Sequence, residues 1–184
     1  PEDLVVVSLE DGRVLEGTMR PSSDTPTHLR LYQAFPNLGG VVHPHSSFAA
    51  AFAQAGKDIP ALGTTHADHF RGDVPTSRLM TETEIEGKYE LETGNVIIET
   101  INERTSDALR MPAVLVRSHG PFTWGKDADQ AVVNAIALEA VAAMAERTLS
   151  LDPDAPHIQE ALLRRHFDRK HGPGAYYGQP GDEH

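Results

Sequence analysis

Val41-Val42-His43-Pro44-His45-Ser46 joins an apolar, strand-like run to the start of a helix and places two histidines at the junction. Side chains alternate between the two faces of a strand, so His43 and His45 point to the same side. Neutral imidazole is the commonest metal ligand in proteins, and two such rings side by side can hold one divalent ion. The alternative is a pair of unrelated surface histidines, and a third ligand is needed to decide.

A second apolar run ends in the same way. Ala113-Val114-Leu115-Val116 is followed by Arg117-Ser118-His119-Gly120, which makes His119 the candidate third ligand. Histidines occur at the ends of two strands that are far apart in the sequence. This pattern favours a shared metal site over an accidental placement of the histidines. Open α/β sheets commonly place their sites at the carboxyl ends of strands, where His43 and His45 fall.

Composition limits the class of protein. The chain has 184 residues, 39% of them hydrophobic, which is enough for one domain with a core. A formal net charge of -11 argues against nucleic-acid or anionic-lipid partners. The absence of cysteine excludes disulfides and thiolate ligands and is compatible with a reducing cytoplasm. No apolar run approaches the roughly 20 residues that cross a bilayer, so we expect a soluble, cytoplasmic protein without a membrane partner.

The first half of the chain shows strand, turn and helix signals in succession. Asp11-Gly12 between two β-prone runs predicts a hairpin. Ser22, Asp24 and Pro26 mark the start of a short helix that ends before Pro36. Ser46-Ser47 begin an alanine-rich helix that ends at Gly56. The polar residues between positions 59 and 70 are interpreted as a solvated turn.

The second half is mostly helical. Thr81-Glu82-Thr83-Glu84 has the form of a capping box and predicts a helix to Asn102, with Gly94 as a weak point or break. Asp127 begins a long helix to about Thr148. Its alanines, Val133, Ile136, Val141 and Met144 are expected to allow close packing on a sheet. A last helix carries Leu162, Leu163, His166 and Phe167 and ends at Gly172.

Two other folds with a His-x-His pair fit poorly. In cupins a glutamate follows within a few residues and the chain is all-β, whereas residues 48–55 here are helical and contain no glutamate. Amidohydrolase barrels need more residues than this chain has.

Five motifs stand in the order that one known family has them. They are Ser22-Ser23-Asp24-Thr25-Pro26-Thr27-His28, His43-Pro44-His45-Ser46, Gly63-Thr64-Thr65-His66-Ala67-Asp68, Ser118-His119-Gly120-Pro121-Phe122 and Ala175-Tyr176-Tyr177-Gly178-Gln179. Over nearly its whole length the chain resembles the L-ribulose-5-phosphate 4-epimerases of the class II aldolase and adducin family. The resemblance implies a three-layer α/β/α fold with a central mixed, largely antiparallel sheet. It also implies a single domain over residues 1–184, with a C-terminal tail at 173–184.

The resemblance implies a metal centre. In the family the His-x-His pair and the later histidine hold a zinc or similar divalent ion, which corresponds to His43, His45 and His119. Zn²⁺ is the expected cofactor, with Mn²⁺ or Co²⁺ as substitutes. Asp24 is expected to orient a ligand or to bind the metal itself, as carboxylates around metal sites do.

The resemblance also implies an acid/base pair. The family's proposed acid/base residues match Asp68 and Tyr177 in this chain. In the family the tyrosine reaches into the site of a neighbouring subunit. A further family histidine, on the last helix, matches His166. The ordinary pKa values of Asp68 and Tyr177, near 3.9 and 10, would have to be drawn toward neutrality by the metal site. The family is a cyclic tetramer with sites at the subunit interfaces, so a homotetramer is expected.

The implied reaction inverts C4 of a small ketopentose phosphate, L-ribulose 5-phosphate. Removing the C4 hydrogen would leave an unstabilised carbanion, because the carbonyl is at C2. Cleaving the C3–C4 bond and re-adding the fragment to its other face avoids that, with a metal ion as the Lewis acid.

The chain departs from the family in two places. The family's Gly-Asn-Xaa-Ser and Lys-Pro-Ser-Gly-like motifs, which build most of the phosphate site, would precede Pro1. Only Ser22 and Ser23 remain of that site, so we expect a domain that is incomplete at its N-terminus, with uncertain activity. The alternative to phosphate binding for Ser22 and Ser23 is simple capping of the helix that follows them. Pro44 stands where close relatives often have threonine, and it removes one backbone donor.

Three alternative functions stay open at this stage. A fuculose-phosphate type of class II aldolase is the first, although those relatives tend to have glutamate at the position of Asp24. An L-xylulose-5-phosphate epimerase shares nearly all the motifs. An adducin-like structural head is the non-enzymatic alternative, and the three histidines disfavour it.

Overall fold

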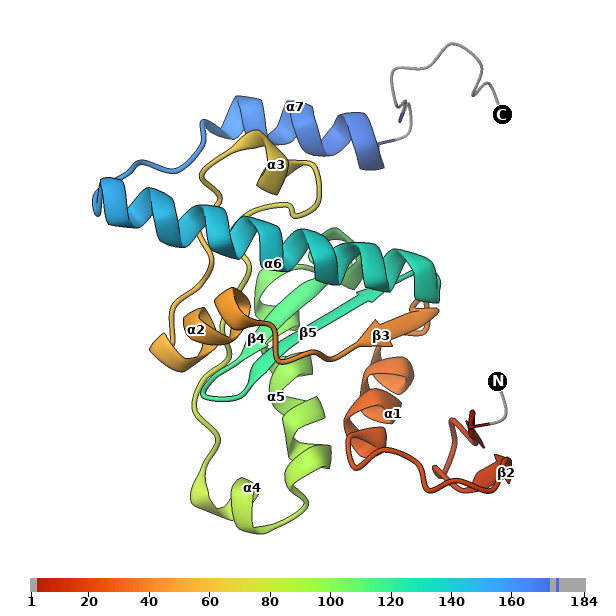
Figure 1. Cartoon of the computed structure of the whole chain (residues 1–184). Helices are drawn as coiled ribbons and strands as arrows, with labels where there is room; N and C mark the ends of the chain where they lie inside the picture. Colours follow the sequence, from red (N-terminus) through yellow and green to blue (C-terminus); the bar gives the residue numbers. More distant parts are fainter. Residues whose placement is uncertain (1–2, 173–174, 176–184) are drawn as a thin grey trace.

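The computed structural model describes residues 3–172 and residue 175 (Figure 1). The elements in chain order are β1 (Val6–Val7), β2 (Val14–Glu16), α1 (Thr25–Ala34), β3 (Gly40–Val42), α2 (Ser47–Ala55), α3 (Thr64–Ala67), α4 (Glu82–Glu86), α5 (Tyr89–Arg104), η1 (Ala108–Arg110), β4 (Ala113–Val116), β5 (Gly120–Gly125), α6 (Ala128–Leu151) and α7 (Glu160–His171). Strands β1 and β2 form the hairpin predicted from Asp11-Gly12, with Gly12 at a φ of 73°.

The central sheet has the order β3-β5-β4, and both neighbouring pairs are antiparallel. A parallel bridge between Thr76 and Leu115 makes the sheet mixed. Helices α6 and α2 pack on one face, and α5, with α1 against it, lies on the other (Figure 1). The α/β/α arrangement with a largely antiparallel sheet is therefore confirmed.

The core lies on both faces of β4 and β5. All residues of these two strands are buried, as expected for strands that are covered from both sides. Trp124 has no exposed surface, and its indole N–H donates to the carbonyl of Ala108 at 2.9 Å. The side-chain amide of Asn134 on α6 donates to the Trp124 carbonyl at 2.7 Å, so α6 is joined directly to the sheet.

Most helix boundaries follow the sequence signals. The Asp127 carboxylate accepts a hydrogen bond from the backbone N–H of Gln130 at 2.7 Å and caps α6. Thr81 and Glu84 form the capping box of α4. Gly56 ends α2 in the left-handed conformation that favours glycine. The end of α7 at Gly172 is also confirmed.

The predicted break at Gly94 is wrong, because α5 passes through it and the interruption lies at residues 87–88 instead. A Cβ at Gly94 would lie 2.7 Å from Cβ of Arg30, so the glycine serves the close approach of α1 to α5. The solvated turn expected between positions 59 and 70 is also wrong. His66 is buried in α3, and its Nε2–H donates to the Gly72 carbonyl at 2.7 Å.

The inward face of α6 differs in part from the expectation. Val141 and several alanines are buried as predicted, together with Asn134 and Leu138. Val133, Ile136 and Met144 are about half exposed or more, because they lie on the opposite side of the helix. Among the described residues α6 is also the one helix long and apolar enough to cross a membrane, contrary to the expectation of no such run. Its packing against all three central strands is that of a core helix.

Candidate active site

The three histidines come from neighbouring strand ends. His43 directly follows β3, and His119 lies in the turn between β4 and β5. Because Val42 pairs with Thr123 in the antiparallel β3-β5 pair, the end of β3 lies beside the start of β5. Ser118 adopts a φ of 62°, which lets the β4-β5 turn close directly before His119.

Their imidazole nitrogens converge at distances that fit a metal ion. The Nε2 atom of His43 lies 3.2 Å from Nε2 of His119 and 3.2 Å from Nε2 of His45. One ligand atom from each of the three rings lies within 4.8 Å of the others. Tetrahedral coordination with bonds of about 2.0–2.1 Å places neighbouring nitrogens about 3.3 Å apart, so the donor set fits Zn²⁺ or a similar ion.

Groups outside the cluster orient two of the rings. His43 Nδ1 donates to the Pro121 carbonyl at 2.8 Å, which leaves the Nε2 lone pair directed at the centre. The His43 ring also stacks on Phe122, with centroids 3.9 Å apart. His119 Nδ1 lies 3.2 Å from the hydroxyl of Tyr89, at the start of α5. Orientation of this kind is typical of metal-ligating histidines.

Burial favours the neutral, ligating form of two of the rings. It lowers the pKa of His43, although the bond to Pro121 and the charge of Asp24 act in the opposite direction. Burial likewise lowers the pKa of His119, and the neighbouring His43 and His45 lower it further. Protons therefore compete weakly for these nitrogens near neutral pH.

Asp24 and the two serines lie at the start of α1. Asp24 is the N-cap residue, its side chain makes no cap hydrogen bond, and its charge acts on both His43 and His119. Ser22 and Ser23 are exposed directly before it. The Ser22 hydroxyl accepts a hydrogen bond from the Asp24 N–H at 3.2 Å, which closes a local turn before the helix and does not cap α1.

A second cluster surrounds Asp68 at the end of α3. His166 Nδ1 donates to Oδ1 of Asp68 at 2.9 Å, and Arg169 Nη2 lies 3.2 and 3.4 Å from the two carboxylate oxygens. His171 Nε2 donates to the Asp68 carbonyl at 2.9 Å. Partial burial raises the pKa of Asp68, but the His166 hydrogen bond and the charges of Lys170 and Arg169 outweigh it and lower that pKa. The expected shift toward neutrality was attributed to the metal site, so for Asp68 it stays a prediction.

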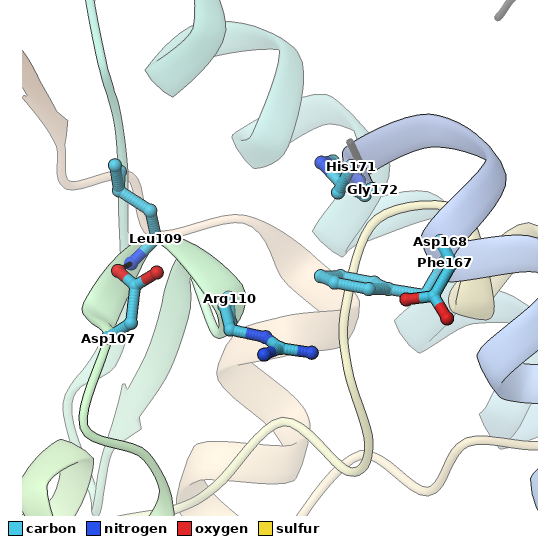
Figure 2. Close-up of a pocket in the computed structure, with 7 residues that line it drawn as sticks. All are labelled: Asp107, Leu109, Arg110, Phe167, Asp168, His171 and Gly172. Carbon is cyan, nitrogen blue, oxygen red and sulfur yellow. Dashed lines mark hydrogen bonds between the residues drawn. The ribbon is translucent and has the colours of Figure 1, made fainter. Parts of the chain in front are cut away.

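A cavity of about 620 Å³ lies between η1 and the end of α7 (Figure 2), and His171 of the second cluster lines it. The guanidinium of Arg110 lies over the Phe167 ring, 5.7 Å from its centroid, and Phe167 stacks on His171. The cavity wall therefore supports the α7 side chains that contact Asp68. None of the metal-site histidines lines it.

The histidine cluster and the Asp68 cluster occupy different parts of the folded chain. Helix α3 packs against α7 and α6, and α6 lies between these helices and the sheet edge that carries the histidines (Figure 1). Tyr177 lies outside the described residues. The structure thus brings together His43, His45 and His119 in one place and Asp68 with His166 in another.

Sequence reasoning missed several of the supporting residues. Tyr89 gives no signal, because its contact with His119 depends on how α5 packs on the sheet. Phe122 was part of a quoted motif, but no role was assigned to it. Arg169 and His171 lie three and five residues after His166, and that helical spacing would have pointed to Arg169.

The fold and the site define a class: an α/β/α domain with a cluster of three histidines that could hold a metal ion at one edge of its sheet. Residues 1–145 match the Class II Aldolase and Adducin N-terminal domain. The chain belongs to the class II aldolase and adducin family.

Similar proteins agree with this assignment. The chain is 57% identical over 178 residues to proteins named L-ribulose-5-phosphate 4-epimerase UlaF from Salmonella paratyphi A and Salmonella typhi, covering 97% of this chain and 77% of each relative. Among solved structures, an L-fuculose 1-phosphate aldolase aligns with a TM-score of 0.72 at 20% identity, over 91% of this chain and 72% of that one. The L-fuculose-1-phosphate aldolase of Thermus thermophilus aligns with a TM-score of 0.61 at 22% identity, over 83% and 72%. The structural likenesses support the fold.

Proposed function

We propose that this chain is a metal-dependent sugar-phosphate epimerase that converts L-ribulose 5-phosphate into D-xylulose 5-phosphate by cleaving and re-forming the C3–C4 bond. The observation that carries the proposal is the convergence of three imidazoles, in which Nε2 of His43 lies 3.2 Å from Nε2 of both His45 and His119, in a chain 57% identical to proteins named as 4-epimerases. An adducin-like structural head would not require three converging metal ligands.

His43, His45 and His119 would hold the ion, and we propose Zn²⁺ because a nitrogen donor set at tetrahedral spacing suits it. Mn²⁺ or Co²⁺ are the proposed substitutes. A bound divalent ion would supply Lewis-acid stabilisation of the charge that develops on the substrate's C2 and C3 oxygens. Asp24 adds negative charge beside the cluster and is proposed to orient a ligand or to bind the ion itself. Ser22 and Ser23 are proposed to contact the phosphate of the substrate.

Asp68 and Tyr177 are proposed as the proton-transferring pair on opposite faces of the substrate, and His166 as their catalytic partner. The carboxylate of Asp68 is ionised at neutral pH and can therefore accept the C4 hydroxyl proton. Its role as a base requires that the complete site raise this pKa toward the working pH. The Nδ1 of His166 holds that carboxylate in place at 2.9 Å.

Because α6 lies between the two clusters, we propose that Asp68, His166 and Tyr177 of one chain act at the histidine cluster of another. This arrangement supports a cyclic homotetramer with sites at the subunit interfaces. The domain is proposed to span the whole chain, with residues 173–184 as its tail. A cytoplasmic location is proposed from the cysteine-free composition and the metabolic substrate.

The test is an assay of L-ribulose 5-phosphate conversion with the zinc-loaded protein, with and without a chelator. We expect turnover that is lost on metal removal and restored by added Zn²⁺. Tyr177→Phe should lower turnover by roughly 10²–10⁴-fold while the bound metal is retained. Unchanged turnover in Tyr177→Phe would overturn the role of the tyrosine.

A class II aldolase is the second candidate, because the aligned solved structures include L-fuculose 1-phosphate aldolases. The same assay separates the two, since an aldolase releases the cleaved two-carbon aldehyde phosphate into solution and an epimerase keeps it bound. L-xylulose 5-phosphate is the competing epimerase substrate, and the ratio of kcat/KM for the two sugars decides between them.

A further inference from the structure

We propose that Glu139, on α6, is a positioning residue for the metal centre that acts through α2; this inference rests on the proposed metal-dependent function. The two carboxylate oxygens of Glu139 accept hydrogen bonds from the backbone N–H of Phe48 at 2.8 Å and of Ala49 at 2.9 Å. These are N–H groups in the first turn of α2, which have no partner within their own helix. The side chain of Ser46, the N-cap residue, makes no cap hydrogen bond. Glu139 therefore caps α2 in place of a neighbouring residue, although it lies 91 positions from Phe48 and 90 from Ala49 in the sequence.

Helix α2 contacts both segments that deliver ligands. Its N-cap residue directly follows His45 in the chain. Near its other end, the Ala53 carbonyl accepts a hydrogen bond from the N–H of Ser118 at 3.0 Å, one residue before His119. A shift of α2 would move one ligand segment relative to the other and change the spacing of the three nitrogens.

Glu139 is well placed to set the position of α2, because its own helix is fixed to the sheet. Thr123 on β5 donates from its hydroxyl to the Ala131 carbonyl of α6 at 3.1 Å, and Asn134 of α6 donates to the Trp124 carbonyl. Two hydrogen bonds from one carboxylate define the orientation of the α2 terminus as well as its distance. The positive end of the helix dipole adds a favourable interaction with negative charge.

A cap that only stabilised α2 would behave differently from a positioning residue. Loss of a structural cap lowers the stability of the fold and leaves the metal affinity of the folded protein unchanged. Loss of a positioning residue weakens metal binding in protein that is still folded. Residues that support metal ligands from outside typically change metal affinity by about 10–100-fold when they are replaced.

The experiment compares wild type, Glu139→Ala and Glu139→Gln with Glu146→Gln as the matched control. Glu146 lies on the same helix and is exposed. Its carboxylate accepts a hydrogen bond from the hydroxyl of Ser150, a residue of α6 itself. The probe is Zn²⁺ alone, titrated in competition with a chromophoric chelator. We expect binding at least about tenfold weaker in both Glu139 variants. Glu146→Gln should match the wild type, and the amides of Phe48 and Ala49 should exchange hydrogen faster in metal-free Glu139→Ala.

The outcomes separate this inference from the proposed function. Wild type that binds no Zn²⁺ would overturn the metal centre and the inference together. Wild-type binding with unchanged affinity in folded Glu139 variants, even with faster amide exchange, would overturn the positioning role alone. If Glu139→Ala does not fold, Glu139→Gln and Glu139→Asp decide, because the first keeps the length of the side chain and the second keeps its charge.

Discussion

The histidine cluster and the Asp68 cluster both gather titratable groups, but they are built in opposite ways. In the first, His43 and His119 use their outer nitrogens for Pro121 and Tyr89 and direct lone pairs at a common centre. In the second, the carboxylate of Asp68 is already matched by cations and donors of α7. The first is therefore a donor set arranged for a ligand. The second is a cluster in which opposite charges and hydrogen bonds already hold the carboxylate in a fixed position.

The two clusters lie on opposite sides of α6 within one chain (Figure 1). If the proposed function is right, an active site combines the histidine cluster of one chain with Asp68 and His166 of another. Variants in the two clusters should then differ in metal content and should be able to complement each other.

The largest effect is expected from His119→Ala. Removing one of three nitrogen ligands should abolish metal binding and reduce turnover on the order of 10³-fold or more, because Lewis-acid stabilisation contributes several kcal/mol. Metal analysis and the epimerisation assay measure both quantities. Asp68→Asn is the matched control, and it should lose turnover but keep its metal. A His119→Ala protein with a full complement of metal would contradict the assignment.

The next prediction concerns the division of the site between chains. Co-expressed His119→Ala and Asp68→Asn chains, each inactive alone, should together recover roughly a quarter of the wild-type activity, because a quarter of the interfaces combine an intact histidine cluster with an intact Asp68. Activity per assembly is measured after purification through two different affinity tags. No recovery in assemblies that contain both chains would place the whole site within one chain.

The sequence allowed the histidine cluster to be predicted, because its ligands lie where local patterns are strong. His-x-His at a strand end fixes two rings on one side, and the second strand end at His119 follows the same pattern. The Asp68 cluster could not be derived in this way. Asp68 and His166 are 98 positions apart, on two helices whose contact depends on tertiary packing, and only the family resemblance connected them.

The helix predictions failed where packing overrode local propensity. Gly94 has low helix propensity, yet α5 continues through it because α1 must approach closely. On α6 the alanines and Val141 were correctly assigned to the packed face, but Ile136 was assigned to it as well and is 67% exposed. Local propensity identifies helices here, but it does not identify the face that packs.

A smaller effect is expected from Gly120→Ala, which tests how closely the histidine cluster is packed. A Cβ at this position would lie 3.3 Å from Cδ2 of His45 and 3.4 Å from the Pro44 carbonyl. The ring must move by a few tenths of an ångström, so we expect Zn²⁺ affinity to fall by about three- to tenfold. Gly63→Ala is the control, because a Cβ there meets nothing within 4 Å. Equal affinity in the two variants would show that the cluster accommodates the methyl group.

The smallest effect concerns the Asp68 cluster and acid. The pKa of Asp68 lies below its ordinary value of 3.8, so the unfolded chain binds this proton more readily than the folded chain does. Its contribution to stability is therefore present above that value and is lost as the pH falls below it. Between about pH 5 and about pH 3, Asp68→Asn should lose less unfolding free energy than the wild type, as measured by urea titration. Asp154→Asn, at an exposed position before α7, is the control and should follow the wild type. Parallel pH curves for Asp68→Asn and wild type would mean that the contacts with His166 and Arg169 do not stabilise the ionised carboxylate, and the contrast with the histidine cluster would no longer hold.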